Sequence, residues 1–161
     1  MPKGGDPFRG IARAAAAEFA DQGAGLQNRP AAMARAAARL EFLMQSITQD
    51  PRYAALPASN ALAMGGAVRE VRQALGIAPS ALPEQVIGFL TDAANAMEAG
   101  REPAWPMAIF PGGPVLTRQR LAAPGPLAEA AIATGRLDEA IAALDAASAW
   151  GGVASTPAPG G

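Results

Sequence analysis

Apolar residues recur every three or four positions along four segments of the chain, which is the spacing of one face of an α-helix. The clearest stripe passes through Met33, Leu40 and Ile47. Pro or a short capping side chain lies near the start of these segments, and Gly or Asp-Pro follows them, as at helix boundaries. The pattern predicts helices over residues 7–22, 30–49, 60–75 and 83–99.

Residues 101–125 break this pattern because they are rich in Pro, which interrupts helices. We expect an irregular Pro-rich loop here, with a short helical turn near residues 114–122. The loop is nevertheless apolar, so it has to cover an apolar surface. It does so as a lid on its own bundle, as an exposed hook for a partner, or as the rim of an apolar pocket. Its large apolar side chains are Trp105, Met107, Ile109 and Phe110.

Residues 126–150 regain helical spacing. The run ATGRLDEAIAALDAA resembles the turn and second helix of a tetratricopeptide repeat, with Gly135 at the tight turn. The small, large and small packing positions of that family fall on Ala140, Leu144 and Ala147. The resemblance implies an antiparallel helix hairpin over 126–150, because a peptide-binding array needs several such repeats. The composition of residues 151–161, GGVASTPAPGG, predicts a disordered tail.

Composition favours helices throughout the chain. Much of the 50% hydrophobic fraction is Ala, the strongest helix former, and β-branched residues are few. A length of 161 residues fits one domain. The predicted fold is all-α: a single bundle of five or six short helices over residues 1–150, with an apolar Pro-rich loop and a C-terminal helix hairpin.

The chain contains no Cys and no His, which removes disulfides, thiol nucleophiles, imidazole bases and the usual zinc ligands. Carboxylate pairs occur at Glu98/Glu102 and Asp138/Glu139, where a solvated helix surface is the simpler interpretation than a catalytic dyad. We therefore predict no catalytic, cofactor-binding or metal-binding residues, and a protein that is not an enzyme.

The net charge of −1 lacks the basic excess of a nucleic-acid-binding protein. No apolar run approaches the length of about 20 residues that a membrane-spanning helix needs. Acidic and basic residues interrupt the Ala-rich N-terminal stretch, which argues against a signal peptide. We expect a cytoplasmic protein, and the preference for Ala, Gly, Pro and Arg is typical of a GC-rich bacterial genome.

Two groups of residues are candidates for binding a partner. Phe42 lies about 160° around the helix from Leu40, on the side that carries Arg35 and Arg39. An aromatic ring beside Arg is typical of protein–protein hot spots, although a central helix packed on both faces would also place Phe42 there. The second group belongs to the Pro-rich loop and consists of Trp105 and Phe110.

These observations favour a non-catalytic helical protein, with protein–protein interaction or assembly as an accessory subunit as its function. The partner is another protein or a second copy of the chain. One alternative is a carrier of a small apolar ligand, with an adaptable wall of Met33, Met44, Met64 and Met97. A second alternative is an enzyme of unknown class. The sequence leaves the choice between lid and hook open.

Overall fold

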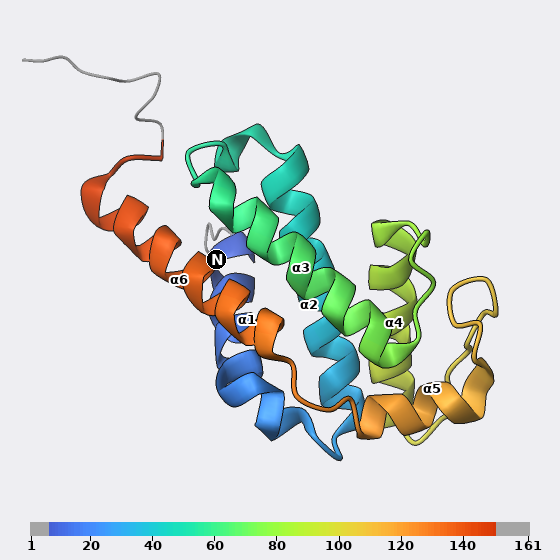
Figure 1. Cartoon of the computed structure of the whole chain (residues 1–161). Coiled ribbons are helices and arrows are strands. Elements are labelled where there is room, and N and C mark those ends of the chain that lie inside the picture. Colours follow the sequence, from blue (N-terminus) through green and yellow to red (C-terminus); the bar gives the residue numbers. More distant parts are fainter. Residues whose placement is uncertain (1–6, 151–161) are drawn as a thin grey trace, which may run out of the picture.

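The computed structural model describes residues 7–150, which form an all-helical bundle (Figure 1). Its six helices are α1 (Pro7–Gly23), α2 (Pro30–Gln49), α3 (Ala58–Leu75), α4 (Pro83–Glu98), α5 (Gly113–Ala122) and α6 (Ala128–Ala147). Two short 3-10 turns, Ala24–Leu26 and Pro51–Tyr53, precede α2 and α3. The predicted all-α bundle is confirmed, and the predicted tail at 151–161 lies outside the described residues.

Helix boundaries follow local sequence signals. α2 begins at Pro30, where the missing backbone N–H costs nothing because the first turn of a helix has no acceptor for it. Beyond its other end, the Asp50 carboxylate accepts a hydrogen bond from the Arg52 backbone N–H at 3.0 Å and starts the next turn. α3 stops at Gly76, whose φ of 74° lies in the left-handed region that Gly adopts without strain.

α2 is the centre of the bundle and packs against α1, α3, α4 and α5. In Figure 1 it runs behind α3, with α1 and α6 on one side and α4 and α5 on the other. Small side chains let the neighbouring helices approach closely, since four Ala of α2 are buried together with Met33 and Leu40. The buried Ala residues of α2 are Ala34, Ala36, Ala37 and Ala38.

The predicted C-terminal hairpin is wrong, because residues 128–147 form one continuous helix through Gly135. A single Gly costs a helix only about 1 kcal/mol relative to Ala, and α6 offsets that cost by packing along α1 and α3. Glu70 of α3 also caps the start of α6 by accepting hydrogen bonds from the backbone N–H groups of Glu129 and Ala130, at 3.1 and 2.9 Å.

The Pro-rich segment is a lid, so the hook alternative is wrong. Ile109 and Phe110 are buried in the core, and the Trp105 ring packs edge-on against Phe110 with 5.1 Å between ring centroids. The Ala78 backbone N–H donates to the Ile109 carbonyl at 2.9 Å, which fixes the segment to the α3–α4 loop. The second half of the predicted irregular stretch is the helix α5, where a helical turn was expected.

Candidate functional site

Arg35 connects α2 to α4. Its Nε donates to Glu98 Oε2 at 3.1 Å, and its Nη2 donates to Asn95 Oδ1 at 2.7 Å. The guanidinium hydrogen bond favours the ionised carboxylate and so holds the pKa of Glu98 below its ordinary value. Arg35 thus has partners within its own chain, and its predicted role in binding another protein stays a prediction.

Arg39 connects α2 to α1 through an ion pair with Glu18. One carboxylate oxygen of Glu18, Oε1, is buried and has no hydrogen-bond partner among the described residues. Burial therefore raises the pKa of Glu18 above its ordinary value, and the weaker opposing effect of the Arg39 charge does not cancel it. This contact places an incompletely satisfied carboxyl group between two core helices.

We expect Glu18 to make folding less favourable as the pH rises. The pKa of Glu18 is higher in the folded chain than in the unfolded chain, so the folded chain holds the proton more tightly. Its stabilising contribution is complete below the ordinary pKa of 4.5 and is lost as the pH rises through the folded pKa. Urea unfolding of wild type and Glu18→Gln between pH 4 and 7 measures this loss. Parallel pH profiles of the two proteins would contradict it.

Phe42 is half-buried and packs against the core, as expected for a central helix with neighbours on more than one face. Trp105 and Phe110 are buried, with 7% and 0% of their surface exposed, so little of their surface is accessible to a partner on the folded chain. The structure therefore does not bring the five predicted partner-binding residues together in one exposed patch.

A buried ion pair that the sequence pattern did not predict joins Glu41 of α2 to Arg72 of α3. Arg72 donates from Nε to Glu41 Oε2 at 2.7 Å and from Nη2 to Glu41 Oε1 at 2.8 Å. Its Nη1 donates to the carbonyls of the α3–α4 loop, at 3.3, 3.1 and 2.9 Å for Ala78, Pro79 and Ala81. The available signal was the position of Glu41 next to Leu40 in the apolar stripe of α2.

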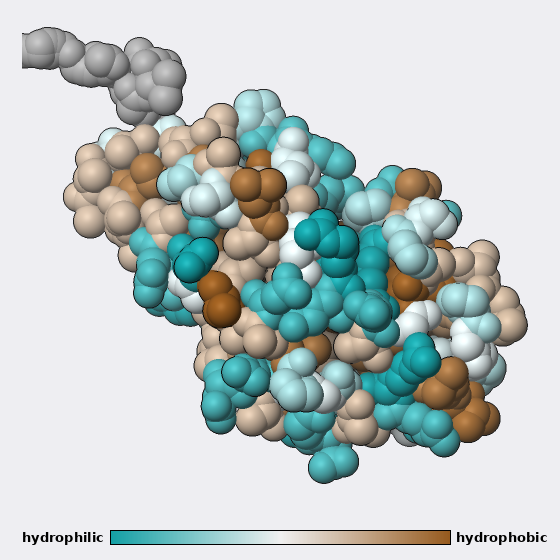
Figure 2. All heavy atoms as spheres, viewed as in Figure 1, coloured by the Kyte–Doolittle hydropathy of each residue, from teal (hydrophilic) through white to brown (hydrophobic). Residues whose placement is uncertain are grey.

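An open apolar groove of about 680 Å³ lies beside this ion pair, between α3 and α5. Two stretches of the chain form it, namely residues 68–79, which are the second half of α3 and the loop after it, and residues 111–120, which are most of α5 and the two residues before it. Its apolar lining includes Val68, Ile77, Pro79, Pro111 and Leu116. Figure 2 shows hydrophobic side chains gathered at the N-terminal end of α5, where Val115 and Leu116 are exposed.

The charged side chains of this groove are all basic. Arg69 and Arg72 come from α3, Arg120 comes from α5, and no Asp or Glu lines the groove. Glu41 of α2 neutralises the charge of Arg72, whereas Arg69 and Arg120 form no ion pair within residues 7–150. The Arg120 guanidinium lies against Gly76 at the end of α3. The groove therefore combines an apolar floor with positive charge from two helices.

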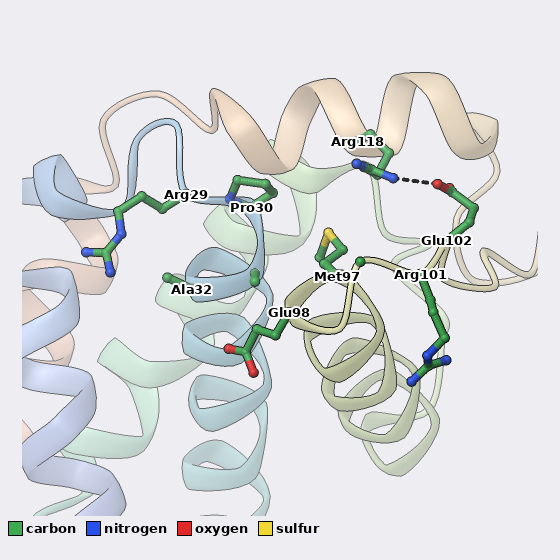
Figure 3. Close-up of a pocket in the computed structure, with 10 residues that line it drawn as sticks. Arg29, Pro30, Ala32, Met97, Glu98, Arg101, Glu102 and Arg118 are labelled. Carbon is green, nitrogen blue, oxygen red and sulfur yellow. Dashed lines mark hydrogen bonds and ion pairs between the residues drawn. The ribbon is translucent and has the colours of Figure 1, made fainter.

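A second open hollow, of about 710 Å³, lies between the start of α2, the end of α4 and α5 (Figure 3). Met97 points into it, and Arg29, Arg101 and Arg118 surround it. Arg118 Nη1 donates to Glu102 Oε1 at 2.6 Å across its rim. The charges in this hollow have both signs, so it lacks the uniform character of the α3–α5 groove.

Glu98 forms an ion pair with Arg35 and Glu102 forms one with Arg118, and the two carboxylates point away from each other in Figure 3. Within the described residues, no three His, Cys, Asp or Glu side chains lie close enough to hold a metal ion. None of the helices between residues 7 and 150 combines the length and hydropathy needed to cross a bilayer. Met33 and Met64, expected to line a carrier cavity, are fully buried core residues.

No protein-family model, curated protein or solved structure matches this chain significantly. Support for a function therefore comes from the residues of this chain alone.

Proposed function

We propose that the protein is a non-catalytic interaction protein that binds a segment of another protein in the groove between α3 and α5. The observation that supports this function is the groove itself, whose apolar lining stays open on the folded chain. A partner that covers it removes apolar surface from water, which is the main favourable contribution to association. Exposed apolar patches with a polar rim mark such interaction sites on folded proteins.

The shape of the groove defines how a partner is held. Both of its walls are helices, and no strand edge borders it, because the described chain contains no strand. A bound segment therefore cannot extend a sheet by main-chain hydrogen bonds and must insert side chains between the helices. Leu116 stands at the rim with 37% of its surface exposed, where such a side chain would meet it.

We expect Leu116→Asp to weaken binding of the partner by about tenfold or more, which corresponds to about 1.4 kcal/mol. The substitution places a charge without a counter-ion in the apolar contact. Leu62→Asp is the matched control, because Leu62 also lies on a helix, is 78% exposed and does not line the groove.

The partner is first captured by a photo-cross-linking amino acid at position 116 and, as the control, at position 62, in the cells that express the protein. Calorimetry with the purified partner then gives the affinities of the two Asp variants. The proposal requires cross-linking from position 116 alone and a loss of affinity in Leu116→Asp alone. Equal behaviour of the two positions would reject the groove, and cross-linking of one copy to another would identify the occupant as a second copy.

The same proposal places the protein in the cytoplasm of a bacterium and assigns it no reaction. Its support is compositional, namely a chain without Cys that uses Arg almost to the exclusion of Lys and lacks His as a general base.

A further inference from the structure

The positive charge of the α3–α5 groove is local. The whole chain carries a net charge of −1, yet the charged residues that line the groove are three Arg. Arg72 is neutralised by its two hydrogen bonds to Glu41. Arg69 and Arg120 keep their charges free of any ion pair within the described residues. The groove is therefore lined by two guanidinium groups that form no ion pair within the described residues, and that of Arg69 lies over Gly65 and Gly66 near the Glu129 carboxylate.

The two guanidinium groups come from opposite walls. Arg69 belongs to α3 and is exposed, whereas Arg120 belongs to α5 and lies against Gly76. Ile77 and Pro79 of the α3–α4 loop supply apolar surface between these walls, and Leu116 adds apolar surface from α5. The groove thus presents a central apolar surface and basic groups on both helices.

We infer that the groove binds an acidic apolar peptide segment, with two or three apolar side chains flanked by Asp or Glu. This inference rests on the proposed function and names the chemistry of the partner. Apolar side chains fill the floor, and the carboxylates pair with Arg69 and Arg120, since a guanidinium binds a carboxylate by two parallel hydrogen bonds. Complementary charge at such a rim raises the association rate and excludes partners of the wrong sign.

Nucleic acid fits this surface poorly. Binding to a phosphate backbone draws on many basic contacts along a strand, and the groove offers two free Arg around an apolar floor. A basic peptide would place like charges against both walls. An acidic apolar segment is the occupant that satisfies the floor and the two Arg together.

The inference is tested by selecting random 12-residue peptides displayed on phage against the full chain, and in parallel against Leu116→Asp. We expect the wild-type chain to enrich sequences with Leu, Phe or Met next to Asp or Glu, and Leu116→Asp to lose them. A synthetic peptide of the selected sequence is then measured by fluorescence anisotropy at low and high salt. Its affinity is expected to fall as salt rises, because exposed charges are screened.

Charge reversal at one wall gives a second, independent measurement. Arg69→Glu is expected to weaken binding of the acidic peptide about two- to fivefold, in line with the energies of exposed ion pairs. A version of the peptide with Lys in place of its acidic residues should bind Arg69→Glu better than wild type. Arg136→Glu is the matched control, because Arg136 is exposed on α6 and does not line the groove.

The outcomes separate the inference from the proposed function. If the selected peptides are lost in Leu116→Asp but are apolar and neutral or basic, the inference of an acidic partner is wrong, and the proposed docking function still holds. If peptide binding is unchanged by Leu116→Asp, or if no peptides are enriched, both the acidic partner and the proposed docking function are wrong. Acidic peptides that respond equally to Arg69→Glu and Arg136→Glu would also overturn the inference, because their binding would follow net charge and not the groove.

Discussion

Arg72→Met is expected to lower the free energy of unfolding by about 3–5 kcal/mol, because it leaves a buried carboxylate without its partner. Glu41 and Arg72 are only 5% and 10% exposed in their side chains. Met keeps much of the length of Arg but donates no hydrogen bond, so the Ala78, Pro79 and Ala81 carbonyls also lose the hydrogen bonds that Arg72 donates to them.

Urea unfolding followed by circular dichroism measures this effect. Arg69→Met is the control, since Arg69 is exposed on the same helix and its replacement should change stability by about 0.5 kcal/mol or less. If Arg72→Met does not fold, the double variant Glu41→Leu/Arg72→Met provides the comparison. The double variant should be more stable than Arg72→Met alone, because no charge is then buried without a partner. If Arg72→Met folds and its free energy of unfolding lies within about 1 kcal/mol of the wild-type value, the prediction is contradicted, because an ordinary substitution costs about that much.

The helices could be predicted because their signals are local. Pro30 and the Asp50-Pro51 step define α2 without reference to any other part of the chain. The Glu41–Arg72 pair could not be predicted in the same way. Its members lie 31 positions apart, and no local sequence pattern around either residue identifies the other as its partner. Only the packing of α2 against α3 brings them together.

The same distinction explains the wrong hairpin. Gly135 is a local helix-breaking signal, and the tetratricopeptide resemblance placed it at the turn between two helices. The surface that keeps α6 straight is supplied by α1 and α3, more than fifty positions earlier in the sequence. Leu137 and Ile141 are buried on that surface, beyond the Gly that was expected to end the helix.

The candidate site in the structure differs from the predicted partner-binding residues for a related reason. Aromatic residues in a Pro-rich segment fitted both a packed lid and an exposed contact, and Trp105 and Phe110 form part of the core. The surface left open is the groove that adjoins them, where Pro111 and Gly112 continue the chain. The groove joins residues 68–79 to residues 111–120, so no periodic pattern within a single stretch of the sequence marks it.

Phe110→Ala is expected to lower the free energy of unfolding by about 3–5 kcal/mol, because the Phe110 ring is fully buried and its removal leaves a cavity. The ring also loses its edge-on contact with Trp105. Thermal and urea unfolding measure the loss. Met107→Ala in the same segment is the control, because Met107 is 62% exposed and its truncation removes little buried surface.

This substitution also separates a local role of the lid from a global one. Phe110 directly precedes the groove residues Pro111 and Gly112, and its carbonyl accepts a hydrogen bond from the Gly113 backbone N–H at 3.0 Å, where α5 begins. Loosening of the lid should therefore open α5 before the rest of the bundle. We expect amide hydrogen exchange in Phe110→Ala to accelerate first across residues 111–122, at denaturant concentrations where α2 stays protected. Uniform acceleration in all helices would show that Phe110 supports the whole core and not the groove wall in particular.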